Sequence, residues 1–162
     1  MAQPPAVSSD DLSGRETAFG DTVIISVGYE GRSVEELVSL LTDNGVNVLV
    51  DVRLNAVSRK RGLSKTALGN ALNDAGIEYR HERALGNPKD NREPFRNGEE
   101  RAKNRYRAVL GNGSRPAYDA AIRLSLETRI ALLCFERSHE SCHRSCITEM
   151  VEKHHGISCL AV

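Results

Sequence analysis

A cysteine, a histidine and an arginine follow one another at Cys142, His143 and Arg144 and offer the clearest chemistry in the chain. Helical spacing begins at Ser141, and a helix N-terminus favours anions and raises the thiolate fraction of a cysteine. Cys142 could therefore be a thiolate nucleophile, or part of an anion-binding site with its two neighbours. The structural alternative is a small cysteine packed beneath the helix, which is the role we expect for Cys146.

Further polar groups follow the apolar runs that we expect to form strands. They are Tyr29, Glu30 and Arg32 after the first run, Asp51, Arg53, Ser58 and Arg59 at the second, His81 at the third, and Glu136, Cys142, His143 and Arg144 after the fourth. In an open α/β sheet the ligand-binding crevice lies beyond the carboxyl ends of the strands. We therefore expect these groups to converge in one cleft.

The residue types divide into binding and catalytic groups. An anion would be bound by Arg32, Arg53, Ser58, Arg59, His143 and Arg144, because guanidinium groups suit phosphate. The candidate acids, bases or nucleophiles are Tyr29, Glu30, Asp51, His81, Glu136 and Cys142. Besides Cys142, two of these have a structural alternative: Asp51 could orient Arg53 or cap the following turn, and His81 could be a hydrogen-bonded structural imidazole.

The charge distribution favours an anionic partner. Formal net charge is zero, but the stretch from Val52 to Asn73 has no acidic residue and contains Arg53, Arg59, Lys60, Arg61 and Lys65. The favoured hypothesis is an enzyme, a hydrolase or a transferase, acting on a phosphate-bearing small molecule or nucleic acid. The first alternative is a non-catalytic module that binds nucleotide or nucleic acid through the basic stretch, and the second is a zinc or redox cysteine protein.

The cysteine spacing does not favour a metal. Thiolate and imidazole from Cys134, Cys142, His143 and Cys146 suit zinc, but structural zinc sites prefer closely spaced cysteine pairs. We therefore predict no metal and no cofactor. The chain also lacks the Gly-x-Gly-x-x-Gly and Gly-x4-Gly-Lys-Ser/Thr motifs, which argues against a dinucleotide-binding fold and a nucleoside triphosphatase.

The elements that must position these groups alternate between strand and helix. Strands are predicted over Thr22–Val27, Val46–Val52, Ile77–Arg80, Arg129–Phe135 and Ile157–Val162. Ser33 and Glu36 form a capping box for the first helix, and Ser64 caps the second. Later helices are predicted over Arg101–Leu110, Pro116–Glu127 and Ser141–His155, and a long polar loop over His81–Glu100. This order predicts an α/β three-layer sandwich with a mostly parallel, Rossmann-like sheet.

Length and composition place the chain in a broad class. Its 162 residues fit one domain, which we expect over residues 21–162 after a flexible tail over residues 1–20. No apolar run is long enough to span a membrane, and the start does not resemble a signal peptide. The four cysteines are therefore interpreted as reduced thiols in a cytoplasmic protein. The oligomeric state stays open.

Several of these motifs together resemble domain-of-unknown-function family 488. They are Val27–Ser33, Asp51–Arg53 with Ser58 and Arg59, Tyr79–His81, Leu85 with Gly86, and Cys134–Glu136 with Cys142–Arg144. The resemblance extends from about residue 22 to about residue 155. It implies a compact prokaryotic α/β protein and does not imply a particular reaction.

Overall fold

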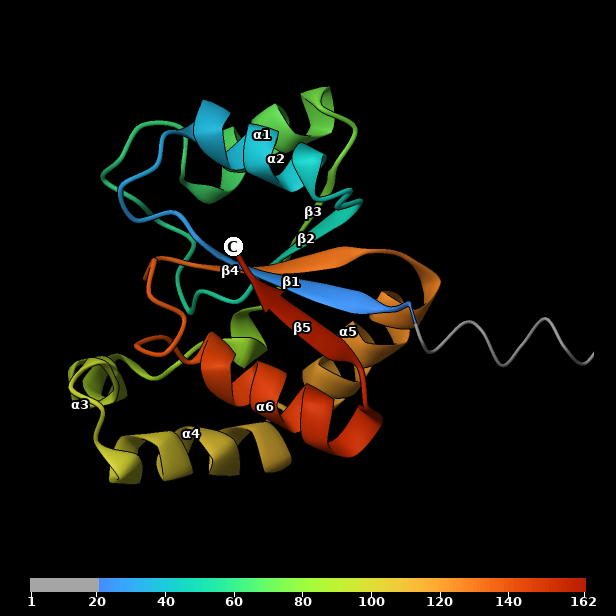
Figure 1. Ribbon diagram of the computed structural model, residues 1–162. Coiled ribbons are helices and arrows are strands. Elements are labelled where there is room, and N and C mark those ends of the chain that lie inside the picture. Colours follow the sequence, from blue (N-terminus) through green and yellow to red (C-terminus); the bar gives the residue numbers. More distant parts are fainter. Residues whose placement is uncertain (1–20) are drawn as a thin grey trace, which may run out of the picture.

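A parallel sheet of five strands forms the centre of the fold in this computed structural model, which describes residues 21–162 (Figure 1). The strands are β1 (Val23–Gly28), β2 (Val48–Asp51), β3 (Glu78–His81), β4 (Ile130–Cys134) and β5 (Ser158–Ala161). Their order across the sheet is β3-β2-β4-β1-β5, and every neighbouring pair is parallel. The expected N-terminal tail, residues 1–20, lies outside the described residues.

Helices cover both faces of the sheet and give the predicted three-layer α/β architecture (Figure 1). The helices α1 (Val34–Asp43) and α2 (Lys65–Asp74) lie on one face. The opposite face carries α4 (Glu100–Gly111), α5 (Arg115–Glu127) and α6 (Arg144–His155), with the short α3 (Arg92–Arg96) beside α4. Among residues 21–162, none of the helices has the length and apolar character needed to cross a membrane.

Successive residues of each central strand enter different hydrophobic cores. Ile24 of β1 packs with α4, α5 and α6, whereas Ile25 packs with α1 and α2. The same alternation separates Leu132 from Leu133 in β4. Side chains of a strand point alternately to its two faces, so a strand buried on both sides must be apolar throughout. This requirement explains the unbroken apolar runs in the sequence.

The position of β4 decides which loops meet. It lies between β1 and β2, so the loops after these three strands are neighbours at the carboxyl edge of the sheet. The contact is close: a Cβ added to Gly28 would lie 1.9 Å from the backbone oxygen of Glu136. Only glycine therefore fits at the end of β1.

Some local predictions are confirmed and others need correction. The capping box is present, since the Ser33 hydroxyl accepts from the Glu36 backbone at 3.1 Å and the Glu36 carboxylate accepts from the Ser33 backbone at 2.7 Å. Ser64 occupies the N-cap of α2, but its hydroxyl bonds to the backbone of Ser58 instead of to the helix. The last helix begins at Arg144 and not at Ser141, so Cys142 lies in the preceding turn.

The segment predicted as a polar loop, His81–Glu100, is more ordered than expected. It contains two 3-10 turns, Arg83–Leu85 and Lys89–Asn91, followed by α3. Leu85 and Phe95 are fully buried in the core beneath α4, and they anchor the segment. Two buried apolar side chains spaced ten residues apart carry no recognisable period, which is why the sequence pattern did not predict these turns.

Two buried tyrosines give a test of the packing beneath α4 and α5. Tyr118 is almost fully buried, and its hydroxyl has no hydrogen-bond partner among residues 21–162. The Tyr106 hydroxyl donates to the Leu85 carbonyl at 2.6 Å. We expect Tyr118→Phe to leave the free energy of unfolding unchanged or to raise it by up to about 1 kcal/mol, whereas Tyr106→Phe should lower it by about 1–3 kcal/mol.

Urea unfolding of the two variants beside the parent protein measures both values. A larger loss for Tyr118→Phe than for Tyr106→Phe would contradict this assignment of the two hydroxyls.

Candidate functional site

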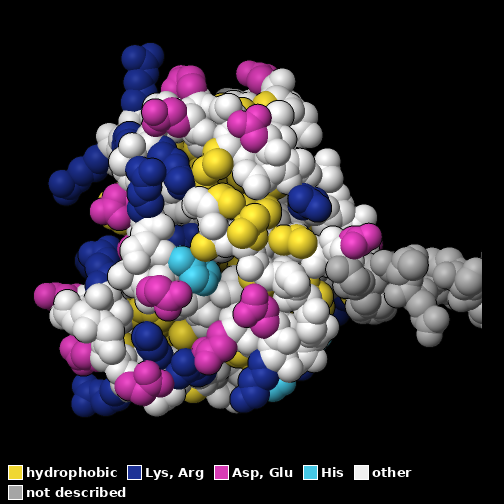
Figure 2. All heavy atoms as spheres, viewed as in Figure 1, with side chains coloured by type: hydrophobic (Ala, Val, Ile, Leu, Met, Phe, Trp, Pro, Cys, Tyr) yellow, Lys and Arg dark blue, Asp and Glu magenta, His cyan; other side chains and the backbone are white. Residues whose placement is uncertain are grey.

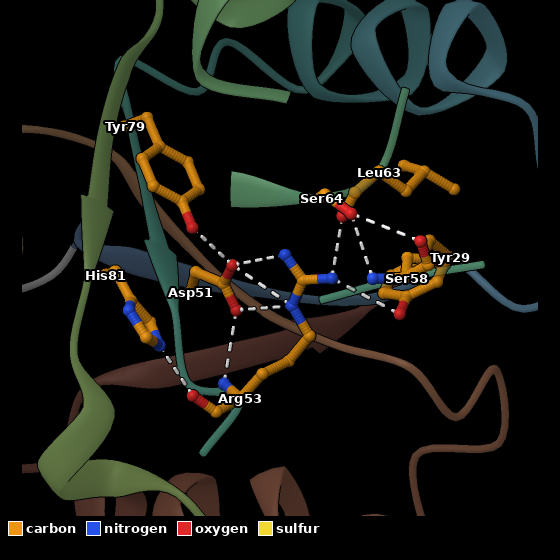
Figure 3. Close-up of polar contacts among 8 residues, drawn as sticks. All are labelled: Tyr29, Asp51, Arg53, Ser58, Leu63, Ser64, Tyr79 and His81. Atoms are coloured by element: carbon orange, nitrogen blue, oxygen red, sulfur yellow. Dashed lines mark hydrogen bonds and ion pairs between the residues drawn. The ribbon is translucent and has the colours of Figure 1, made fainter. Parts of the chain in front are cut away.

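A buried ion pair stands at the end of β2. Asp51 is fully buried and accepts hydrogen bonds from Arg53 through the backbone N at 3.1 Å, Nε at 2.8 Å and Nη2 at 2.6 Å (Figure 3). The Tyr79 hydroxyl donates to the same carboxylate at 2.6 Å. Burial by itself lowers the pKa of Arg53, but the hydrogen bonds and charge of Asp51 outweigh it and raise that pKa above its ordinary value. Asp51 therefore orients the Arg53 side chain and also caps the following turn through the Arg53 backbone N–H, the two structural roles expected for it.

Arg53 connects the pair to the surrounding loops. Its Nη1 donates to the Leu63 carbonyl at 2.8 Å and to the Tyr29 hydroxyl at 3.2 Å, and its guanidinium lies 5.1 Å from the Tyr29 ring centroid. His81 donates through Nε2 to the Arg53 carbonyl at 2.7 Å (Figure 3). The ends of β1, β2 and β3 and the loop before α2 are thus joined through Arg53, by its side chain and by its backbone carbonyl. Because each of its three guanidinium nitrogens donates a hydrogen bond within the protein, Arg53 acts as a structural clamp.

A pocket of about 430 Å³ opens at this carboxyl edge. It is lined by Tyr29, Arg53, Leu54, Asn55, Val57, Ser58, Arg59, Lys60, Asn87, Arg92, Phe95, Arg96, Cys134, Phe135, Glu136, Ser141 and His143. This volume is in the range of small-molecule sites. Figure 2 shows many Lys and Arg side chains gathered on the left of the view, the side toward which the strands run. The pocket therefore lies on the basic side of the molecule.

Half of the predicted site residues line the pocket and half do not. Those that do are Tyr29, Arg53, Ser58, Arg59, Glu136 and His143. Of the others, Asp51 is buried behind Arg53, His81 faces the Arg53 carbonyl, and Glu30 is exposed and accepts from the Arg137 backbone at 3.1 Å.

The remaining two predicted anion ligands are occupied with the protein itself. Arg32 donates to the Gly28 carbonyl at 2.6 Å. Arg144 is 1% exposed and donates to Ser26 Oγ at 2.9 Å and to the Glu136 carbonyl. Neither lines the pocket, so both brace the loops around it.

Sequence reasoning missed two basic residues of the pocket, Arg92 and Arg96. Both lie in the segment after β3 that was predicted as a loop, and α3 presents them to the pocket. Their position after a predicted strand could have identified them, because residues that follow parallel strands lie at the same edge of the sheet. Arg96 pairs with Glu136 at 3.1 Å.

Beneath the pocket, two thiols and an imidazole form a compact buried cluster. The ligand atoms of Cys134, Cys142 and His143 all lie within 4.8 Å of one another. His143 Nδ1 is 3.9 Å from Cys134 Sγ and 3.7 Å from Cys142 Sγ. Cys134 and His143 reach the pocket wall, whereas Cys142 is 1% exposed and is not among the lining residues. These are the donors in residues 21–162 that could hold a metal ion.

The surroundings of the cluster shift the pKa values of its two thiols in opposite directions. Burial by itself raises the pKa of Cys142, but the hydrogen bond from Cys134 and the charges of His143 and Arg144 bring that pKa well below its ordinary value. The same hydrogen bond and burial raise the pKa of Cys134. For His143, burial opposes the charged form, yet the Cys142 thiolate raises its pKa overall. One thiolate is therefore favoured, and it is Cys142.

The other cysteines lie outside the cluster. Cys146 is fully buried in the core against α4 and α5, as predicted, and burial raises its pKa to about 11. Cys159 of β5 is half-buried, and its thiol faces the Thr148 and Ile157 carbonyls. Among residues 21–162 all four cysteines are free thiols.

The fold and the site together define an α/β protein with a basic pocket at the carboxyl edge of a parallel sheet and a thiol–imidazole cluster beneath it. The model of the domain of unknown function DUF488 matches residues 33–151, and the chain belongs to this family. The family assignment confirms the predicted resemblance, although the matched range begins only at the last residue of the first motif. No curated protein and no solved structure matched the chain.

The ion pair at the end of β2 gives a stability prediction. Replacing one partner of a buried pair leaves the other charge uncompensated, so Asp51→Ala should lower the free energy of unfolding by about 3–5 kcal/mol. The matched control is Glu78→Gln, which breaks an exposed pair with Arg80. Exposed pairs contribute little, so the control should unfold like the parent protein.

Denaturant unfolding measures both variants under the same conditions. Equal stability of Asp51→Ala and Glu78→Gln would show that the fold does not depend on the buried carboxylate.

Proposed function

We propose that the pocket at the carboxyl edge of the sheet binds a phosphate-bearing ligand, a nucleotide or the end of a nucleic acid. The observation that supports this most is the charge of the pocket wall. Its basic side chains are Arg53, Arg59, Lys60, Arg92 and Arg96, and Glu136 is its single acidic residue. A cleft lined by one sign of charge concentrates ligands of the opposite sign.

The local pairing leaves an excess of positive charge. Arg53 is neutralised by Asp51, and Arg96 by Glu136. In the part of the chain that the structure describes, the side chains of Arg59 and Lys60 make no hydrogen bond or ion pair, and Arg92 reaches only the Asn87 carbonyl at 3.4 Å. Three cations without a carboxylate partner suit a ligand with two or more phosphate charges.

The composition of the pocket favours a small ligand or a single nucleotide end. Phe135 is 40% exposed at the pocket and could stack on one base. The wall contains three aromatic residues, Tyr29, Phe95 and Phe135, and the first two are buried. This supports one bound base better than a strand of several stacked bases.

We further propose that the bound ligand is chemically transformed, by hydrolysis or group transfer. Glu136 and His143, which can transfer protons, and the Cys134 thiol line the same pocket as the basic residues. A non-catalytic binding module would need only the basic wall. The free thiols support a cytoplasmic location, because thiols stay reduced there.

Binding can be tested with inorganic pyrophosphate and a fluorescein-labelled, 5′-phosphorylated oligonucleotide. We expect Arg59→Ala and Arg92→Ala each to weaken binding about tenfold, because each removes one charge-assisted contact. Arg129→Ala, at the opposite edge of the sheet before β4, is the control and should bind like the parent protein. Affinity should fall steeply as salt is added.

Two results would contradict the proposed ligand class. One is an affinity that does not change between low and high salt. The other is an equal affinity of Arg59→Ala, Arg92→Ala and Arg129→Ala.

A further inference from the structure

We propose that Cys134, Cys142 and His143 form a binding site for a zinc ion, with the Glu136 carboxylate as the fourth donor. The site goes beyond the proposed anion binding and does not depend on it, and with the ion bound these four residues would serve as its ligands and not as proton-transfer groups. It also reverses the prediction made from cysteine spacing. The donors are distant in sequence but meet where the end of β4 faces the turn before α6.

The separations of the donor atoms fit a tetrahedral ion. Zn–S bonds of about 2.3 Å and Zn–N bonds of about 2.0–2.1 Å place a sulfur and a nitrogen on the same ion about 3.6 Å apart. The two sulfur-to-Nδ1 distances here are 3.7 and 3.9 Å. Glu136 Oε2 lies 3.2 Å from Cys134 Sγ but outside the set of three donors whose atoms all lie within 4.8 Å of one another, so its carboxylate must move to complete the tetrahedron. The two thiols and the imidazole therefore need only small side-chain shifts to hold an ion.

The hydrogen bonds of His143 present the correct ring nitrogen. Its Nε2 lies 3.0 Å from the Val52 carbonyl, and because a carbonyl only accepts, Nε2 must carry the hydrogen. In the neutral imidazole, the form that binds a metal, the lone pair is then on Nδ1, which faces both sulfurs. The Tyr106 ring packs edge-on against the imidazole with centroids 5.0 Å apart and fixes its plane. A ligand histidine held through its other nitrogen is the usual arrangement in metal sites.

The charges around the site balance when a divalent ion is present. Two thiolates and one carboxylate carry three negative charges, and a divalent cation leaves one. The buried Arg144 guanidinium, whose Nε donates to Cys142 Sγ at 3.2 Å, supplies the remaining positive charge inside the protein, and Arg96, which pairs with Glu136 at 3.1 Å, lies at the exposed side of the site. A buried cluster with zero net charge avoids the large cost of an unpaired buried charge.

The donor types select the ion, and the pocket provides access. Thiolate and imidazole favour Zn²⁺ over Mg²⁺ or Ca²⁺, which prefer oxygen ligands. Cys134, Glu136 and His143 line the pocket, so an ion can enter from solvent. The bound ion would then lie at the floor of the basic pocket, within reach of a ligand held by its walls.

The experiment titrates Co²⁺, a spectroscopic substitute for Zn²⁺, into the reduced full-length protein after removal of metal with a chelator. We expect saturation at one equivalent, with thiolate-to-cobalt charge-transfer absorption and the intense visible bands of a tetrahedral ion, and displacement by Zn²⁺. Cys134→Ser and Cys142→Ser should each weaken binding by about a hundredfold or more, and Glu136→Gln by about tenfold.

Cys159→Ser is the matched control, because it removes a thiol whose hydrogen bonds lie outside the cluster, and it should keep full Co²⁺ binding. Circular dichroism checks that each variant is folded. If Cys142→Ser does not fold, differential alkylation of the parent protein replaces it. Zn²⁺ should then protect Cys134 and Cys142 and leave the labelling of Cys159 unchanged.

Three outcomes would overturn the site. They are absence of charge-transfer absorption in the reduced parent protein, unchanged absorption in Cys134→Ser and Cys142→Ser, and alkylation of Cys134 and Cys142 that Zn²⁺ does not slow. A Cys134–Cys142 disulfide in the oxidised protein, together with any of these, would identify a redox pair instead. Pyrophosphate binding, measured on the same metal-free protein, separates failure of this site from failure of the proposed anion binding.

Discussion

The buried pair of Asp51 and Arg53 is the interaction on which the carboxyl edge of the sheet depends. Asp51 ends a strand that is buried on both faces, so its carboxylate has no access to water and must be satisfied by the protein. Arg53 satisfies it with three hydrogen bonds, and then uses its remaining donor group to hold the Leu63 carbonyl and the Tyr29 hydroxyl. The segment between β2 and α2 is thereby fixed, with Arg59 and Lys60 at the pocket wall.

A second buried arginine has the corresponding role on the other side of β4. Arg144 joins Ser26 of β1, the Glu136 carbonyl after β4, and the Cys142 thiol before α6. The two guanidinium groups thus hold different loops around the same pocket. Buried charges of this kind contribute less to net stability than well-packed apolar groups. Their main effect here is to fix the positions of the loops and strand ends that they contact.

The pocket and the thiol cluster adjoin each other, with the cluster at and beneath the floor of the pocket. Basic residues from the loops after β2 and β3 form the upper wall, and Cys134, Glu136 and His143 form the floor. Cys142 lies below that floor, where Arg144 and His143 favour its thiolate form. An anion held by the upper wall and an ion held at the floor would therefore share one pocket. Because Cys134 and His143 belong to both the pocket and the thiol cluster, we interpret the two as one functional region.

The sequence by itself determined the elements and the edge where they present polar groups. Continuous apolar runs such as Thr22–Val27 must be buried on both faces. Their alternation with helical segments therefore predicted a parallel sheet covered by helices on both sides. Since parallel strands all end at one edge, it also fixed that Tyr29, Arg53, Arg59, Glu136 and His143 would meet there. The Ser33–Glu36 capping box was also predictable, because both of its hydrogen bonds join residues within one four-residue segment.

Only the tertiary structure decided which polar groups face the pocket. The placement of β4 between β1 and β2 cannot be read from any one segment, and it is what brings Cys134 beside Cys142 and His143. Arg32, Arg53 and Arg144 carry the same charge as Arg59, but they donate to protein carbonyls and to a carboxylate, whereas among residues 21–162 the Arg59 side chain makes no hydrogen bond or ion pair. The physical reason is that a buried polar group must find a partner, and the partners come from distant parts of the chain.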